Sequence, residues 1–530
     1  MKNAAIMRLP LGALAAAMNL INPEAVHCRE QIRDWAFFYR EKLNGRGYPF
    51  HIDAAGLSMD VRSIAPAGPI KRGRGMKLLG LDLGTTTLSA VVLDGDTGAL
   101  LKTLNVPNGA YMTPRAPYER IQDADAIARR AEALVEALKE EYAIDAIGLD
   151  GQMHGIVYVN ARGEAVSPLF TWQDGRGGER FGSGSYAGAL YDRCSAHVAT
   201  GYGMATHFWH TVNSCVPRGA AAICTIGDYV GMRLTGRAEP LMHVSNAASL
   251  GLFDERAGNW NFAAIERAGM GAGLLPRVTG GYELLGRDSG GAPVACGIGD
   301  NQASFIGALR DMEGTLLVNL GTGGQVSMLS GGASATEELE LRPLTGDRSI
   351  IVGSALCGGR AYALLEGFLR SCAALAGYDC PDALYEEMNR AGLEHLRDAS
   401  LPRVDPRFNG TRADPALRGS VCGIGTDNFD APRLIAGTLL GMAGQMRGLY
   451  DAMLAAGASP ARRLVGSGNA VRRNPALRRA LEGAFGMKMR LSAHREEAAL
   501  GAALFAMTAA GVAPSLEAAQ RLIRYEGERP

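Results

Sequence analysis

A tight bend near residue 85 carries residue types that bind phosphate and a metal ion. Within LLGLDLGTTTLSAVVLDGDTG (Leu78–Gly98), Asp82 and Gly84 are followed by three threonines, Thr85–Thr87. An ordinary hairpin needs only a two-residue turn such as Asn-Gly. Backbone N–H groups in a glycine turn converge on phosphate oxygens, threonine hydroxyls add donors, and one carboxylate beside phosphates suits Mg²⁺. The bend therefore predicts a polyphosphate and Mg²⁺ site, with a plain hairpin as the alternative.

A second bend of the same kind lies in TLLVNLGTGGQVSML (Thr315–Leu329), where Asn319 stands in the place of Asp82. Its turn residues are Gly321, Thr322 and Gly323. Two such bends on facing domains can hold a polyphosphate between them, and the acid in only one of them indicates which side holds the metal. Neither GxxxxGK[ST] nor GxGxxG occurs, so P-loop and Rossmann chemistry are unsupported.

An acid that could act as a general base lies in ACGIGDNQASFIGAL (Ala295–Leu309). Asp300 follows a Gly-Ile-Gly turn, directly precedes an expected helix, and has Asn301 and Gln302 beside it. Its place just before the second bend puts it near the junction of the two domains, where a carboxylate can accept the proton of a hydroxyl that attacks a phosphate. The alternative is a helix N-cap, a position that aspartate fills well.

Two polar stretches, GQMHG and TWQDGR, combine apolar faces with several hydrogen-bonding groups. Their candidate ligand-binding residues are Gln152, Met153, His154, Trp172, Gln173, Asp174 and Arg176. GQMHG follows a strand, and α/β proteins bind ligands just beyond the ends of their strands. The mixture suits a polyhydroxylated ligand, with a structural histidine and a core tryptophan as the alternatives.

A third glycine turn, in RLVGSGNAVRRNP, leaves room for a flat base to lie on the backbone. Its residues are Gly466, Ser467, Gly468 and Asn469. By itself this turn says little, because small-residue turns between strands and helices are common.

Strand and helix patterns alternate from Met76 onward, which indicates an α/β fold with an antiparallel start. The expected elements are two strands within Leu78–Asp94, a helix at Tyr118–Tyr142, a strand at Ile144–Asp150, and helices at Tyr362–Ala376, Ala431–Ala456, Asn474–Phe485 and Glu496–Ala510. Both halves open with a strand, a glycine turn and a strand, so the sequence predicts an internal duplication.

The first 75 residues fit poorly with the rest. Met1–Asn22 faintly resembles a secretory signal, Arg29–Leu43 could form an amphipathic helix, and Pro66–Gly75 reads as a linker. We expect an appended or mis-started segment outside the functional part of the chain; an accessory element or a targeting signal is the alternative. The expected domains are 1–75, 76–310 and 311–530.

The composition excludes some partner classes. Lys plus Arg equals Asp plus Glu at 54 each, so no electrostatic case exists for nucleic acid or an anionic membrane. Nine scattered cysteines without a CxxC pair favour reduced thiols in a cytoplasmic protein.

Taken together, these stretches resemble the FGGY carbohydrate kinases of the actin and hexokinase ATPase superfamily. LDLGTTT and GTGGQ are similar to the family's two phosphate motifs, GSGNAVRRNP to its adenosine motif, GDNQAS to its catalytic-aspartate loop, and TWQDGR to part of its sugar site. The resemblance runs from Leu78 to Met507. GSG in place of GGG is a departure, but Ser467 is small enough for ATP to fit.

The resemblance implies two RNase H-like domains around a central cleft, with the sugar in the first and the nucleotide in the second. It implies ATP and Mg²⁺ as cofactors, Asp300 as the general base and Asp82 as the metal ligand. The implied phosphate and nucleotide contacts come from the three glycine turns described above, Thr85, Thr86 and Thr87 included. The implied sugar contacts are Gln152, Met153, His154, Trp172, Asp174, Arg176 and Asn301, with His207 as a weaker candidate.

The same resemblance narrows the substrate. MHG and TWQDGR are similar to ketose kinases, and TGYGMATHFWH, IGDYV and SNAASLGLFD favour the branch that acts on seven-carbon ketoses. The expected reaction is transfer of phosphate from ATP to a terminal hydroxyl of sedoheptulose; xylulose or another ketose or polyol is the alternative. A non-enzymatic actin-like ATPase would lack the sugar stretches. We expect a monomer or homodimer.

Overall fold

The computed structural model describes residues 7–9, 50–53, 56–59 and 75–528, except 197, 412, 413 and 415. The chain forms two compact units, Met1–Gly75 and Met76–Pro530. The described residues of the first unit form an antiparallel sheet of order β1-β3-β2, whose strands are β1 (Met7–Leu9), β2 (Phe50–Asp53) and β3 (Gly56–Met59). The expected helix at 29–43 lies outside the described residues, as do most of the signal-like run and the linker.

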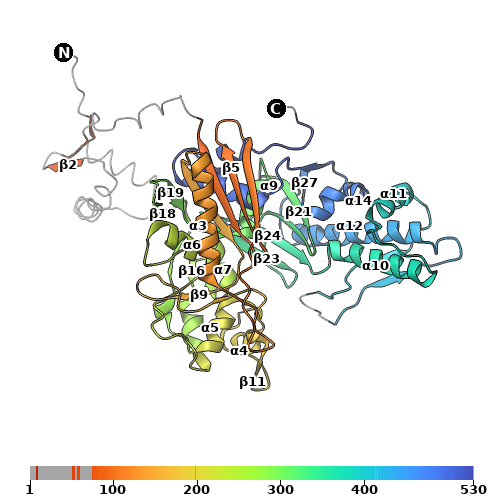
Figure 1. Cartoon of the computed structure of the whole chain (residues 1–530), viewed down its shortest axis with the longest axis horizontal. Coiled ribbons are helices and arrows are strands. Elements are labelled where there is room, and N and C mark those ends of the chain that lie inside the picture. Colours follow the sequence, from red (N-terminus) through yellow and green to blue (C-terminus); the bar gives the residue numbers. More distant parts are fainter. Residues whose placement is uncertain are drawn as a thin grey trace, which may run out of the picture. The chain divides into compact units, whose positions relative to one another are not determined.

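The second unit contains two mixed sheets built on one plan (Figure 1). The first has the order β18-β19-β8-β4-β5-β6 and the second β23-β24-β22-β21-β27-β28. Their strands are β4 (Lys77–Leu83), β5 (Thr87–Asp94), β6 (Leu100–Pro107), β8 (Ala146–Gly151), β18 (Leu284–Arg287) and β19 (Pro293–Ala295), then β21 (Thr315–Leu320), β22 (Gly324–Leu329), β23 (Leu339–Thr345), β24 (Arg348–Ala355), β27 (Arg463–Ser467) and β28 (Met489–Leu491).

The two sheets share their strand directions as well as their order. In the first sheet β5 runs antiparallel to both β4 and β6, and β8 runs parallel to β4. In the second sheet β22 runs antiparallel to both β21 and β24, and β27 runs parallel to β21. The expected internal duplication and α/β fold class are therefore confirmed.

Helices cover both sheets, and they fall close to the expected ranges. They are α3 (Ala124–Glu141), α4 (Tyr186–Cys194), α5 (Gly203–Val212), α6 (Ile226–Thr235), α7 (Val244–Leu250), α8 (Phe262–Arg267), α9 (Asp300–Ala308), α10 (Gly359–Leu375), α11 (Tyr385–His395), α12 (Ala431–Ala455), α13 (Asn469–Arg473), α14 (Pro475–Phe485), α15 (Glu497–Ala509) and α16 (Leu516–Gln520). α3 packs on β4 and β5, and α12 packs on β22 and β24. Among the described residues, no helix combines the length and apolarity that a membrane crossing requires.

The first expected helix begins later than the sequence pattern predicted. Tyr118 lies in a turn, and Ile121–Gln122 forms the short strand β7, which pairs with β10 (Leu169–Phe170). Asp123 is the N-cap, because its side chain accepts a hydrogen bond from the backbone N–H of Ala126. The apolar stripe was therefore read correctly, but the strand that precedes the cap was missed.

The helices α9 and α15 pack against each other, and α15 also lies on β4 and β8. Glycines allow this approach: a Cβ on Gly307 would lie 1.9 Å from the carbonyl oxygen of Glu497, and one on Gly501 would lie 1.9 Å from that of Ala303. The hydrophobic cluster around the two helices takes side chains from both sheets, including Leu78 and Leu317. The end of the chain thus returns to the first sheet and ties it to the second.

Candidate active site

Three aspartates meet at the carboxyl ends of neighbouring strands. Asp82 on β4 lies opposite Asp150 on β8 in the parallel register. The short strand β20 (Ile298–Gly299) pairs with β8 on its other side, with Ile298 opposite Asp150, and leads directly into Asp300. This is the edge at which open α/β sheets bind their ligands.

The N-cap alternative for Asp300 is wrong. The structure places Gly299 at the N-cap of α9 and Asp300 at the first helical position. The carboxylate is therefore not used to cap the helix, and it lies beside the other two acids, whose charges interact with it.

Burial dominates the electrostatics of the cluster. It raises the pKa of Asp82 to about 7, and the charge of Asp300 adds to the shift. It raises the pKa of Asp150 well above its usual range, with Asp82 and then Asp300 adding to the shift. The pKa of Asp300 is raised to about 6 by burial, while the backbone N–H of Asn301 and the charge of Arg342 oppose the rise. A cation bound at the cluster would oppose these shifts and favour the ionised carboxylates.

The first glycine bend is held by side chains from three other segments. The amide of Asn108 donates to the carbonyl of Gly84 at 2.8 Å, and that of Gln122 donates to the carbonyl of Thr85 at 2.8 Å. The indole N–H of Trp172 donates to Thr85 Oγ1 at 3.0 Å. The bend is thereby fixed and brought into direct contact with TWQDGR.

The other residues of this region extend the same contact. Thr85 Oγ1 also donates to Gln152 Oε1 at 3.3 Å, so GQMHG reaches the bend as well. Thr86 is exposed at the tip and Thr87 begins β5.

The second bend packs against the third glycine turn. Gly468 has a φ of 85°, and a Cβ there would lie 2.5 Å from the carbonyl oxygen of Leu320. The backbone N–H of Gly359 donates to the carbonyl of Gly321 at 2.8 Å, and that of Gly358 to Thr322 at 3.0 Å. In the parallel register Ser467 lies opposite Asn319, so this sheet carries neutral residues where the first carries Asp150 and Asp82.

A cavity of about 840 Å³ opens beside this turn. Its lining includes Gly359, Tyr362, Tyr385, Asn469, Ala470 and Asn474. Asn469 begins α13, directly after the GSG turn, and Gly466 and Ser467 end the preceding strand β27. The cavity is therefore lined by Asn469, which ends the predicted adenosine turn, and by Gly359, whose N–H donates to the carbonyl of Gly321 in the second bend.

Met153 and His154 lie close to the aspartate cluster. A Cβ on Gly299 would lie 2.8 Å from the sulfur of Met153. His154 has a φ of 71°, its ring stacks on that of Tyr202 at 4.3 Å between centroids, and its Nδ1 is 2.6 Å from the carbonyl oxygen of Ser249. Strained backbone of this kind is common at ligand sites.

Asp174, Arg176 and His207 lie together in a buried network rather than on an open surface. Arg176 Nε donates to Asp174 Oδ1 at 2.6 Å, and its Nη1 lies 2.6 Å from His210 Nε2. The hydroxyl of Tyr158 lies 2.9 Å from His207 Nδ1. Burial lowers the pKa of His207 to about 4 and that of His210 to about 3, so both rings are neutral. Trp172, by contrast, is 47% exposed.

The sequence reasoning missed Asp150, Tyr202, His210 and Arg342. Asp150 had a local signal, because it is an acid within a fully buried strand and directly precedes GQMHG. Tyr202, His210 and Arg342 had none, because each reaches its neighbours only through the tertiary fold.

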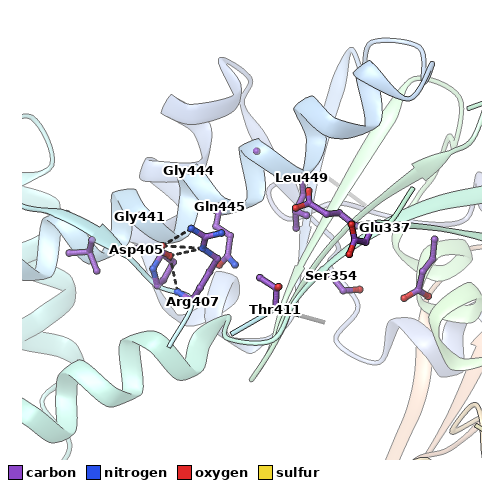
Figure 2. Close-up of a pocket in the computed structure, with 14 residues that line it drawn as sticks. Glu337, Ser354, Asp405, Arg407, Thr411, Gly441, Gly444, Gln445 and Leu449 are labelled. Atoms are coloured by element: carbon purple, nitrogen blue, oxygen red, sulfur yellow. Dashed lines mark hydrogen bonds and ion pairs between the residues drawn. The ribbon is translucent and has the colours of Figure 1, made fainter. Parts of the chain in front are cut away.

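A second cavity, of about 500 Å³, lies between α12 and β24 (Figure 2). Gly441, Gly444 and Gln445 come from α12, and the Asp405–Arg407 ion pair, at 2.7 Å, forms another wall. None of the sequence-predicted site residues lines it. Across the described ranges, no group of three or more His, Cys, Asp or Glu side chains forms a metal site by itself.

Comparisons with known proteins agree with this geometry. The model of the N-terminal domain of the FGGY family of carbohydrate kinases matches residues 77–317, and that of its C-terminal domain matches residues 317–510. The chain is 29% identical to sedoheptulokinase from Mus musculus, over 80% of this chain and 96% of that protein, and 27% identical to a xylulose kinase from Streptomyces coelicolor, over 81% and 87%.

A solved structure shows the same fold. The crystal structure of xylulose kinase from Rhodospirillum rubrum has a TM-score of 0.73 and 21% identity, and the match covers 85% of this chain and 93% of that one. The two sheets, their glycine bends and both family models cover the same part of the chain. This chain belongs to the FGGY family of carbohydrate kinases.

Proposed function

We propose that this carbohydrate kinase transfers phosphate from ATP to a terminal hydroxyl of a ketose, with sedoheptulose as the first candidate. The observation that carries the proposal is the position of Asp300, which lies beside Asp82 and Asp150 at the strand ends. The identity to mouse sedoheptulokinase, which spans nearly all of that protein, supports the choice of sugar.

In the proposed reaction Asp300 takes the proton from the attacking hydroxyl, whose oxygen then forms a bond to the γ-phosphorus as the bond to ADP breaks. Positioning and charge neutralisation supply most of the rate. Met153, His154, Gln152 and Trp172 would contact the sugar, and Asn301 would hold it beside the base. Asp174 and Arg176 would contact the sugar as well, with His207 as a weaker candidate, and the Arg176–Asp174 ion pair would also hold TWQDGR in place.

Mg²⁺ fits the acid cluster. Both carboxylate oxygens of Asp150 are buried and lack a hydrogen-bond partner within the described part of the chain. We propose that Asp82 would hold the ion, with Asp150 next to it on the paired strand β8. The ion would neutralise charge on the phosphates.

The nucleotide would lie in the cavity beside the GSG turn. Its base would lie against Gly468, Asn469 and Ala470, and its phosphates would reach Gly321, Thr322 and Gly323 on one side and Thr85 to Thr87 on the other. The proposal includes a sugar domain at 76–310, a nucleotide domain at 311–530, a cytoplasmic location and a monomer or homodimer.

The test is a coupled assay of ADP release with ATP and Mg²⁺ against sedoheptulose, xylulose, ribulose, fructose and glycerol. The expected result is the highest kcat/KM with sedoheptulose. A preference for xylulose would keep the mechanism and replace the sugar, which the similarity to a xylulose kinase makes the second candidate. Absence of sugar-dependent ADP release from folded, ATP-binding protein would overturn the proposal.

A further inference from the structure

The β23–β24 hairpin of the second sheet docks against the elements that carry Asp300. The amide of Gln302, on α9, donates to the carbonyl of Pro343 at 2.9 Å, and Asn301 Nδ2 donates to Gln325 Oε1 at 2.8 Å. At the hairpin turn, the N–H of Gly346 donates to the carbonyl of Gly280 at 2.7 Å. α9 therefore lies directly against the strand that contains Arg342.

Arg342 is a buried arginine whose hydrogen bonds are only partly used. It is 8% exposed, and its Nε and Nη2 donate to one oxygen of Glu340, at 3.0 and 2.8 Å. Neither of these two hydrogen bonds involves Nη1. An arginine holds its guanidinium plane rigidly when one edge is bound, so Glu340 leaves the Nη1 edge aimed away from itself.

Two groups of the proposed site act electrostatically on the guanidinium of Arg342. Burial lowers the pKa of Arg342, and the charges of Tyr202 and Asp300 oppose the fall, so both lie within electrostatic reach of the guanidinium. Tyr202 is the ring that stacks on His154. In the same region, Asn301 Oδ1 and Gln302 Oε1 are buried acceptors that have no partner among the described residues.

The buried amide oxygens of Asn301 and Gln302, together with the Nη1 edge of Arg342, indicate which kind of ligand could bind them. A hydroxyl both donates and accepts, so a pair of neighbouring hydroxyls can satisfy Arg342 Nη1 and a buried amide oxygen together. An anionic group is disfavoured as the partner of the two amide oxygens, because it has no proton to donate to them. The expected ligand is therefore a neutral polyol.

We propose that Arg342, aimed by Glu340, is a sugar-recognition residue that the second sheet supplies, and that it binds a hydroxyl of the acceptor next to the one Asp300 deprotonates. This inference rests on the proposed function. Because Asp300 and Arg342 come from different sheets, a bound sugar would bridge them.

The test compares Arg342→Ala, Arg342→Lys and Glu340→Gln with a matched control, Arg348→Ala. Arg348 lies on the same hairpin and pairs with the half-exposed Glu517 at 2.6 Å. Losing a charged hydrogen bond to a hydroxyl should raise the KM for the sugar by about 10- to 100-fold, with the KM for ATP unchanged. Arg342→Lys should keep part of the affinity for the sugar. Glu340→Gln should have a sugar KM between those of the wild type and Arg342→Ala, and the Arg348→Ala control should have the sugar KM of the wild type.

A series of ketoses that each lack one hydroxyl gives the sharper measurement. The wild type should bind one of these deoxy sugars more weakly than the parent ketose, by the same factor that Arg342→Ala loses with the parent ketose. The Arg342→Ala variant should bind that deoxy sugar and the parent ketose with equal affinity. An unchanged KM for the sugar in Arg342→Ala would overturn the inference. So would a general loss of kcat and of affinity for both the sugar and ATP that accompanies a lower Tm. Preference of the wild type for a sugar acid would overturn the neutral-polyol part.

Calorimetry with the same sugars separates this inference from the proposed function. If a ketose binds the wild type but is not phosphorylated, the proposed kinase reaction is wrong. The difference in the Kd for that ketose between the wild type and Arg342→Ala would still test the role of the arginine. Absence of binding by every ketose and polyol would overturn both.

Discussion

Asp300 differs from the other two acids of the cluster in its surroundings. Asp82 and Asp150 lie opposite each other on paired strands, whereas Asp300 begins a helix. The charge of Arg342 also opposes the rise in the pKa of Asp300 that burial causes. A carboxyl group with a pKa of about 6 is mostly ionised at neutral pH and still basic enough to take a proton. The proposed division of labour, a base and a metal-holding pair, follows from these environments.

Asp300→Asn tests that division. It should lower kcat by about 10²–10⁴ while the Kd for ATP stays nearly the same, since the amide keeps the shape but cannot accept the proton. Steady-state kinetics and ATP titration measure the two quantities. Near-normal turnover would remove Asp300 from the chemistry.

The buried histidines of α5 predict a dependence of stability on pH. His207 and His210 have folded pKa values of about 4 and about 3, against 6.5 when unfolded. As the pH falls from about 6.5 to about 4, the unfolded chain binds protons that the folded chain refuses, so each histidine lowers the free energy of unfolding by up to about 1.4 kcal/mol per pH unit.

Urea unfolding at pH 7, 6 and 5 measures this effect. Buried acids with raised pKa values act in the opposite direction, so the comparison is between the wild type and His207→Gln. The variant should be less stable at pH 7 but lose less stability on acidification. Equal losses in both proteins would contradict the assignment of a neutral, buried imidazole.

At the scale of elements, the α9–α15 contact positions Asp300. α9 carries the aspartate at its first residue, and α15 holds α9 through glycine positions where backbone meets backbone. Much of the expected secondary structure was correct here: α12, α14 and α15 begin and end within a residue of the ranges that the apolar pattern predicted. The pattern did not show that α15 packs on the first sheet.

Gly501→Ala tests the helix contact. The new Cβ would lie 1.9 Å from the carbonyl oxygen of Ala303, so we expect a loss of about 1–3 kcal/mol or more. Gly448→Ala on α12 is the matched control, because nothing lies within 4 Å of its Cβ and helix propensity should add about 0.5–1 kcal/mol. Urea unfolding measures both, and similar results for the two variants would contradict the packing account.

At the scale of the whole molecule, residues 76–530 form a compact unit by themselves. Both sheets, the acid cluster, the glycine turns and both family-model matches lie within it. The chemistry proposed above needs no residue from the first 75.

A chain that starts at Met76 should therefore fold and keep the full kcat/KM. Circular dichroism, Tm and the ADP-release assay compare it with the full chain. Loss of solubility or activity would show that the first 75 residues belong to the enzyme.

The sequence by itself determined the alternation of elements, the two phosphate-type bends and the family. These are local properties: a glycine turn, a cap or an apolar stripe is set by residues within a few positions of one another. Asp82, Asp300 and the GSG turn could be proposed because each lies in such a local motif.

Only the tertiary structure decided which side chains meet. Asp150 lies opposite Asp82 through strand register, Arg176 lies against His210 in a buried network, and Asn301, next to Asp300, binds Gln325 of the other sheet. These contacts join residues tens of positions apart along the chain. They depend on how sheets and helices pack, and burial, which sets the charge state of each group, exists only after that packing.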